Sequence, residues 1–236
     1  MTSTPISSSP LTGSGAAPEL TVDRFDATER LFHWAFAIPF LVTLATGLAL
    51  YFPELAKLTG NRELVRDIHR FAGLFTVLLP VLVLLFGDRR NLRRDVTEVD
   101  IWSRDDRQWF RAWLWRKIGG RDRLPPQGRF NSGQKFNAAL TAGCIFWLAL
   151  TGLIIFPGIH PPFWLVSNSR NLHDLAWILL TPAVIGHVFL AAVYPPTRPG
   201  LSGIISGKVP MAWLREHHPL APEAEAPAAG TEPSHN

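Results

Sequence analysis

The sequence predicts an all-α integral membrane protein, a bundle of four transmembrane helices whose N- and C-termini lie on the cytoplasmic side. Two observations predict this fold class. Four apolar runs have roughly the length that a helix needs to cross a bilayer, and they occupy residues 31–52, 71–86, 136–156 and 172–194. Basic residues gather in the connection between the second and third runs, and the positive-inside rule places that connection in the cytoplasm. Because the number of spans is even, both chain ends share its side.

The composition agrees with this class and excludes others. Nine tryptophans and fifteen phenylalanines suit the interfacial and lipid-facing positions of a membrane protein. The formal net charge of +4 comes with no nucleic-acid-binding motif, so we expect it to report membrane topology. The only cysteine, Cys144, allows no internal disulfide, no iron–sulfur cluster held by thiolates and no thiolate zinc site. We expect it to be a small helix-packing residue.

One membrane domain is predicted over residues 23–219, between two disordered tails. Residues 1–22 are rich in Ser, Thr, Pro and Gly and lack the basic start of a cleaved signal peptide, and residues 220–236 are rich in Ala, Pro and Glu. The expected spans are about 30–52, 66–87, 135–156 and 172–194. The second span is extended at its start, so that His69 falls in its first turns.

The basic connection contains an amphipathic segment at residues 105–120, DDRQWFRAWLWRKIGG. As a helix it places apolar side chains along one face and Arg and Lys on the other, the apolar ones being Trp109, Phe110, Trp113, Leu114 and Ile118. This pattern predicts a helix that lies in the headgroup region of the membrane. The alternative is a solvated helix that covers the end of the bundle.

Histidines in the apolar spans are the candidate functional residues. His173 and His187 are fourteen residues apart on the fourth span, which puts them within about 40° of the same helix face and about 21 Å apart along it. His33 begins the first span at the inner surface, and His69 begins the second span at the outer surface. His69 therefore shares the depth of His173, and His33 shares the depth of His187.

Neutral imidazole is a common axial ligand of haem iron. The two depth-matched pairs predict an outer haem between His69 and His173 and an inner haem between His33 and His187. A lone membrane histidine is more often a packing or proton-relay residue, so a haem-free anchor or small transporter remains an alternative. The remaining histidines are expected to be solvated or surface residues: His160, His217, His218 and His235.

Five sequence segments resemble one known family. They are RFDATERLFHW at the first span, DIHRFAG at the second, GRFNSGQKFN before the third, the spacing HD…H in the fourth, and GIISGKVPMAWLREHHP after it. Over roughly residues 24–219 the chain resembles the gamma subunit of respiratory formate dehydrogenase, a diheme cytochrome b with a cytochrome b561-like four-helix bundle.

The resemblance implies that the four histidines named above are the axial ligands of two b haems. It also implies a quinone pocket beside the inner haem, for menaquinone or ubiquinone, formed by Asn131, Gly133 and Gln134. Amide groups can bind a quinone carbonyl, and a glycine lets the backbone approach a ring. The residues alone are equally consistent with an ordinary helix N-cap at Asn131 or Ser132.

By this resemblance, the chain is a multi-pass protein of the bacterial inner membrane that acts in anaerobic or formate respiration. It would pass electrons from a peripheral iron–sulfur subunit, docked outside, through two haems to a quinone on the cytoplasmic side. Substrate oxidation would belong to a partner subunit with molybdopterin-held molybdenum or tungsten, and no catalytic side chain is expected here. The alternative partner is a related hydrogenase or thiosulfate reductase complex. Membrane lipids are expected partners, and nucleic acid is not.

Overall fold

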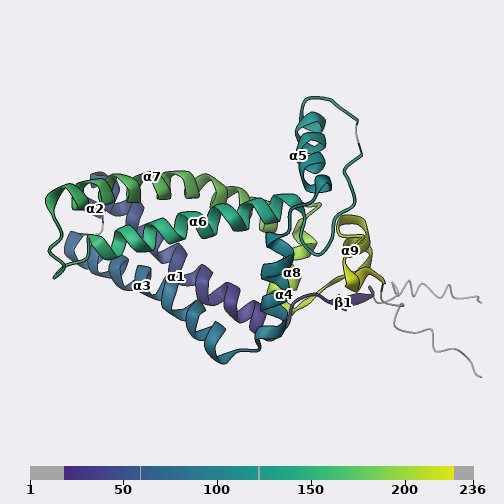
Figure 1. Ribbon diagram of the computed structural model, residues 1–236, viewed down its shortest axis with the longest axis horizontal. Coiled ribbons are helices and arrows are strands. Elements are labelled where there is room, and N and C mark those ends of the chain that lie inside the picture. The colour runs from purple at the N-terminus through teal and green to yellow at the C-terminus, as the bar shows by residue number, and fades with distance from the viewer. Residues whose placement is uncertain (1–18, 59, 122, 226–236) are drawn as a thin grey trace, which may run out of the picture.

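The computed structural model describes residues 19–58, 60–121 and 123–225 (Figure 1). Within this part of the chain, four helices are long and apolar enough to cross a membrane: α1 (Ala27–Tyr51), α3 (Arg62–Phe86), α6 (Ser132–Ile154) and α7 (Phe163–Val188). The fourth span continues without a break into a π-helical turn, η1 (Phe189–Val193). The predicted fold class, a membrane-spanning four-helix bundle, is confirmed.

The helix bounds follow local signals that the apolar runs do not contain. The fourth helix begins at Phe163, well ahead of the expected start at residue 172, because the polar stretch after Pro162 contains neither glycine nor proline and stays helical. The second long helix begins at Arg62, where the Asn61 side chain accepts a hydrogen bond from the Leu64 amide. Residues that precede the apolar runs therefore extend both helices at the predicted outer end.

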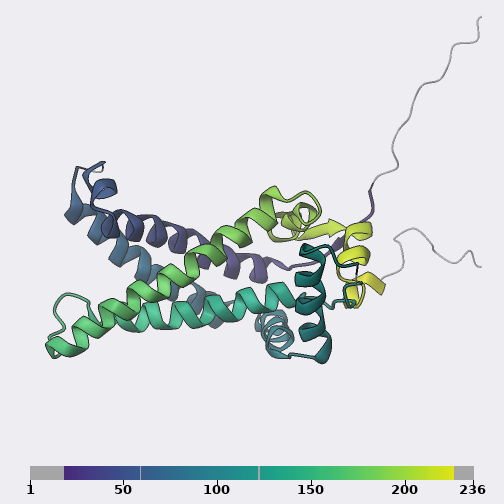
Figure 2. The ribbon, with the colours of Figure 1, turned by 90° about the horizontal axis from the view of Figure 1, so that it is seen from above.

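The bundle consists of two antiparallel helix hairpins. Helix α1 packs along α3 and α6 packs along α7, whereas contacts between the hairpins are sparse by comparison (Figure 2). At mid-depth the two hairpins meet in a core of Phe40, Cys144 and Leu180. The prediction that Cys144 is a packing residue is confirmed, since it is buried in this core.

A cap of short elements covers one end of the bundle (Figure 1). It contains α4 (Arg89–Asp100), α5 (Arg104–Lys117), η2 (Arg198–Gly200), α8 (Leu201–Ser206), α9 (Met211–His217) and η3 (Pro222–Glu225). Strands β1 (Thr21–Asp23) and β2 (Lys208–Pro210) pair antiparallel with Val22 opposite Val209. Helix α2 (Pro53–Leu58) lies at the opposite end of the bundle.

The cap extends the folded region beyond both predicted limits. Strand β1 includes Thr21 and Val22, which were assigned to the N-terminal tail. Ala221 and Ala224, assigned to the C-terminal tail, are buried against Val209 and Leu214. The composition of a short alanine-rich segment predicts disorder. Here the segment is ordered because its alanines pack against the apolar surface of Val209 and Leu214.

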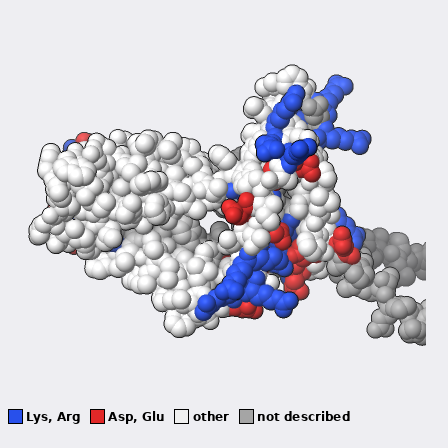
Figure 3. Space-filling model, viewed as in Figure 1, with Lys and Arg blue, Asp and Glu red and all other residues white. Residues whose placement is uncertain are grey.

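Charged side chains gather at the cap, while most of the visible bundle surface carries none (Figure 3). The basic connection, the start of α1 and the segment after α7 all lie at this end. This distribution agrees with a bundle embedded in lipid and a cap in water at one membrane surface.

The amphipathic segment of the basic connection forms helix α5, as the sequence predicted, but its apolar side chains do not share one surface. Phe110 contacts Phe136 of α6, with ring centres 5.8 Å apart, and Trp109 stacks on Trp113. Leu114 and Ile118 remain largely exposed. The aromatic half of the stripe thus holds α5 against the first turns of α6, and the aliphatic half is left facing outward.

Candidate functional site

The structure brings the four membrane histidines together in the two predicted pairs. The rings of His69 and His173 have centres 6.3 Å apart, and those of His33 and His187 have centres 6.5 Å apart. Each pair joins the two hairpins, because α7 supplies one histidine to each pair while α1 and α3 supply the others. The pairs lie at two depths of the bundle, with the second pair nearer the cap.

These distances fit a metal ion held between two imidazoles. If one iron atom bound both rings of a pair from opposite sides, the ring centres would lie about 6 Å apart, because a metal–nitrogen bond is about 2 Å long and a ring centre lies about 1 Å behind its nitrogen. Both observed separations agree with this value. The sparse contact between the hairpins is also what a large flat group inserted between them requires.

Hydrogen bonds fix the ring orientation of the pair farther from the cap. The Nδ1 of His69 lies 3.0 Å from the carbonyl oxygen of Thr43 and 3.2 Å from Thr46 Oγ1. The Nδ1 of His173 lies 2.9 Å from Thr151 Oγ1. A carbonyl oxygen only accepts, so Nδ1 of His69 carries the proton and Nε2 presents the lone pair. This is the tautomer that a metal ligand needs.

The pair nearer the cap has an aromatic neighbour, and its His187 is exposed. The His33 ring makes an edge contact with Trp34, with centres 5.3 Å apart, and within the described residues neither His33 nor His187 has a recorded ring hydrogen bond. About two helical turns from these histidines, Phe40 and Leu180 form the dry core that separates the two pairs. The two pairs therefore share a residue type and differ in what holds the rings.

The segment Asn131–Gln134 forms the helix cap that the residues allowed. The Asn131 side chain accepts a hydrogen bond of 2.9 Å from the Gln134 amide, and the Gln134 side chain accepts one of 2.9 Å from the Asn131 amide. Gly133 allows close packing, since a β-carbon there would lie 3.3 Å from the Trp109 ring. The segment lies at the cap end of α6, on the same side of the bundle as His33 and His187.

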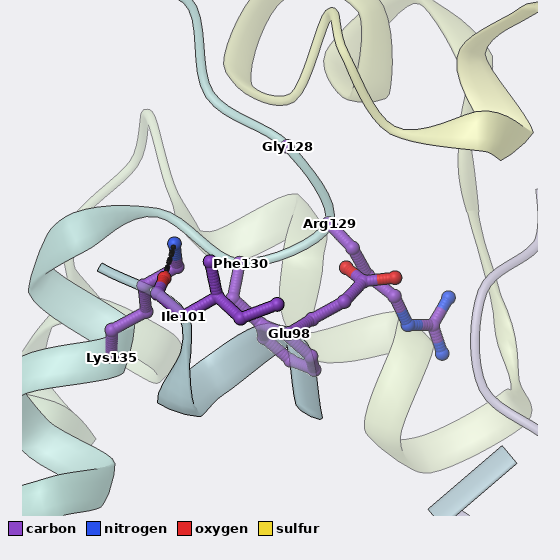
Figure 4. Close-up of a pocket in the computed structure, with 6 residues that line it drawn as sticks. All are labelled: Glu98, Ile101, Gly128, Arg129, Phe130 and Lys135. Carbon is purple, nitrogen blue, oxygen red and sulfur yellow. Dashed lines mark hydrogen bonds between the residues drawn. The ribbon is translucent and has the colours of Figure 1, made fainter. Parts of the chain in front are cut away.

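A hollow of about 190 Å³ lies beside this segment (Figure 4). The Lys135 ammonium donates a hydrogen bond of 2.9 Å to the Ile101 carbonyl beside the hollow. The lining residues are Glu98, Ile101, Gly128, Arg129, Phe130 and Lys135. Pockets that bury a drug-sized ligand measure about 300–1,000 Å³. The hollow is therefore too small to enclose a quinone with its tail, and we do not assign the predicted quinone site to it.

Sequence reasoning missed a buried charge cluster at the centre of the cap. Arg129 has no exposed side-chain surface and donates to three carboxylates, at 2.8 Å to Glu29, 2.7 Å to Asp95, and to Glu223. Burial works against its charge, but these carboxylates raise the pKa of Arg129 above its ordinary value. The nearby Arg24 side chain donates to the Arg129 carbonyl. The cluster ties α1, α4 and the C-terminal segment to the loop before α6.

His218 also departs from its prediction, because it is buried and not a surface residue. Its Nδ1 donates to the Gly128 carbonyl at 2.8 Å. His160 is exposed as expected, and His217 is partly exposed and stacks on Trp213. His235 lies outside the described residues. No feature of the local sequence distinguishes His218 from His217, because its burial depends on a loop ninety residues away.

Four membrane-length helices that carry two histidine pairs define a class: an integral membrane bundle with paired imidazoles at two depths. The chain belongs to the prokaryotic cytochrome b561 family, whose sequence signature matches residues 24–207. Cytochromes b carry b-type haem, so the family supplies the group that the imidazole pairs fit.

Curated relatives are similar over most of the chain. The formate dehydrogenase cytochrome b556(fdo) subunit of Escherichia coli K12 is 29% identical over 213 residues, which cover 84% of this chain and 90% of the relative. The nitrate-inducible cytochrome b556(Fdn) subunit of the same organism is 27% identical over 81% of this chain and 85% of the relative. The formate dehydrogenase cytochrome b556 subunit of Haemophilus influenzae is 26% identical over 80% and 77%.

Proposed function

We propose that this chain is the diheme cytochrome b subunit of a formate dehydrogenase complex in a bacterial inner membrane. The observation that carries the proposal is the pair of ring separations, 6.3 and 6.5 Å, between imidazoles of opposite hairpins. The names of the curated relatives support the assignment to formate dehydrogenase. In this proposal His69 and His173 hold the outer haem, and His33 and His187 hold the inner one.

A bound haem supplies one-electron transfer, and the protein supplies ligands, orientation and a dry environment. The imidazoles bind iron through Nε2, and their place on rigid helices fixes the two haem depths. Phe40 and Leu180 exclude water between the two pairs. If two imidazoles held each haem, its iron would not be open to a substrate, which would suit electron transfer.

The membrane side that each pair faces follows from the side on which the charged cap lies. With the cap in the cytoplasm, the outer pair faces the side where a peripheral iron–sulfur subunit would dock, and the inner pair faces the cytoplasmic side. Formate oxidation takes place in a partner subunit that holds molybdopterin with molybdenum or tungsten. Each electron that crosses from the outer to the inner side works against a membrane potential worth about 2.3 kcal/mol per 100 mV.

Quinone reduction is placed beside the inner pair, at the start of α6. The capping box occupies one side-chain oxygen each of Asn131 and Gln134, and their amide nitrogens have no recorded partner among the described residues. These nitrogens are suitable donors to a carbonyl of menaquinone or ubiquinone. The cap and the quinone contact are therefore compatible, and Gly133 lets the Trp109 ring pack closely beside them.

A related hydrogenase or thiosulfate reductase complex is the second candidate, because the same two haems would serve a different donor. The partners that co-purify distinguish the two: a molybdopterin subunit with formate activity supports the first, and a nickel–iron hydrogenase supports the second.

The test of the haem assignment is a pyridine haemochrome measurement on the purified complex, with the amount of this chain determined independently. We expect two b haems per chain, and the same value in His160→Ala, which changes an exposed histidine outside the pairs. One haem per chain would mean that one pair is structural. No haem, with haem supplied during expression, would overturn the proposal in favour of a haem-free anchor or transporter.

A further inference from the structure

Both hairpins present the same dipeptide to the outer histidine pair. Thr46 and Gly47 on α1 face His69 on α3, and Thr151 and Gly152 on α6 face His173 on α7. In each hairpin the first helix thus carries a Thr-Gly step at the depth of the histidine on the second helix. The sequence alone does not reveal this feature, because Thr-Gly is a common dipeptide in apolar helices. Only the fold shows that both dipeptides lie beside histidine rings.

The direction of the hydrogen bonds can be worked out from their partners. The Thr151 hydroxyl donates to the Trp147 carbonyl at 2.6 Å, so its oxygen is left to accept from Nδ1 of His173. The same holds in the other hairpin, where the Thr46 hydroxyl donates to a carbonyl of its own helix, that of Val42, at 2.7 Å. The single proton on Nδ1 of His69 is then shared between the Thr43 carbonyl at 3.0 Å and the Thr46 oxygen at 3.2 Å.

The adjacent glycines give the rings room. A β-carbon at Gly47 would lie 3.1 Å from Cε1 of His69, which is tighter than an ordinary contact, and one at Gly152 would lie 3.6 Å from Cε1 of His173. The threonine of each step therefore holds Nδ1 of its ring, and Gly47 is in addition required for the space beside Cε1, whereas an ordinary contact would fit at Gly152. The feature that the two outer rings share is the threonine hydroxyl.

We propose that Thr46 and Thr151 are positioning residues that lower the midpoint potential of the outer haem. The inference rests on the proposed function, because it requires iron at Nε2 of both outer histidines. An acceptor at Nδ1–H raises the basicity of the other ring nitrogen, and a more basic ligand stabilises ferric over ferrous iron. The inner pair has no such partner among the described residues, so the effect is confined to one haem.

The experiment is a potentiometric titration of the holo-complex, followed by the optical and electron paramagnetic resonance signals of the two haems. Thr151→Val keeps the shape of the side chain and removes the hydroxyl. We expect two haems per chain, a raised midpoint potential and a shifted resonance for the outer haem, and an unchanged inner haem. Thr151→Ser restores the hydroxyl and is expected to return the outer potential toward the wild-type value.

A matched control lies on the same helix as His173. The Thr181 hydroxyl bonds the Trp177 carbonyl at 2.7 Å, and no contact of Thr181 with a histidine is recorded in the described chain, so Thr181→Val should leave both potentials unchanged. If Thr151→Val loses the outer haem outright, Thr46→Val is the variant to titrate, because His69 keeps its bond to the Thr43 carbonyl. A raised outer potential in that variant supports the proposal.

The outcomes separate this inference from the proposed function. A wild-type complex without two haems refutes the function. A complex with two haems whose outer potential and resonance are the same in wild type, Thr46→Val and Thr151→Val refutes the positioning role and leaves the function standing. A shift of the inner haem in place of the outer one would also refute it, because neither threonine contacts the inner pair.

Discussion

Acidification is expected to loosen the cap through protonation of His218. Burial lowers the pKa of this imidazole from 6.5 to about 4, and the positive charge of Arg24 lowers it further, against the opposing effect of the hydrogen bond to Gly128. When the cap opens, the group returns to its ordinary pKa and takes up a proton. Its contribution to stability is therefore complete above about pH 6.5 and is lost as the pH falls toward 4.

The size of the effect follows from those two values. The difference between 6.5 and about 4 corresponds to about 3 kcal/mol of cap stability between the two ends of that range. The residue is 1% exposed, so solvent screening does not reduce this value much. For a small cap, a loss of this size is a large fraction of the stability that holds β2, α9 and η3 in place.

Hydrogen exchange of the solubilised protein between pH 7.5 and 4.5, corrected for the intrinsic pH dependence of exchange, measures this loss. We expect protection of residues 208–221 to fall in the wild type. In His218→Gln, a neutral side chain that can still donate to the Gly128 carbonyl, protection should persist to lower pH. His217→Gln, which changes the partly exposed neighbour, should behave as the wild type. Equal loss of protection in the wild type and in His218→Gln would assign the acid sensitivity to other groups and refute the reasoning.

Three further predictions concern the candidate sites. His173→Ala should reduce the haem content from two per chain to one and keep the inner haem; retention of both would refute the pairing. Gln134→Glu keeps an oxygen for the capping box and removes the amide donor, so it should slow quinol formation in steady-state assays while both haems still reduce; unchanged turnover would leave the segment a helix cap only. Gly47→Ala should lower the occupancy of the outer haem, measured as haemochrome per chain, because its β-carbon would lie 3.1 Å from the His69 ring, whereas Gly152→Ala, at 3.6 Å from its ring, should retain it. Equal occupancy in both glycine variants would contradict this account of ring space.

The histidine pairs could be predicted because they depend on regular geometry. A span runs at a fixed rise per residue, so the separation of His173 and His187 fixes their relative depths. The positive-inside rule then orients the spans, and orientation decides which early histidine shares each depth. Errors of several residues in the helix bounds do not change this reasoning. The early start of α7 at Phe163, for example, adds turns before His173 and leaves the separation of His173 and His187 unchanged.

The cap could not be predicted in the same way. Arg129 is one of many arginines in the basic connection, and its burial depends on Glu29, Asp95 and Glu223, which come from distant parts of the sequence. Removing one partner of such a cluster leaves charges buried without compensation, so the residues are interdependent in a way that composition does not reveal. The burial of His218 could not be predicted either, because its hydrogen-bond partner, the Gly128 carbonyl, is distant in the sequence and its neighbour His217 is also a histidine.

Helix α6 changes most between the sequence-based interpretation and the structure. It contains no histidine, so the sequence predicts only a packing role for it and a quinone-binding segment at its start. The structure adds Thr151, near its other end, as the hydrogen-bond partner of His173. One helix therefore reaches the proposed quinone site through Gln134 and the proposed outer haem ligand, His173, through Thr151. If the potential of the outer haem depends on that hydroxyl, as proposed, then the helix without a ligand contributes to both ends of the electron path, and a search for functional residues limited to ligands would miss it.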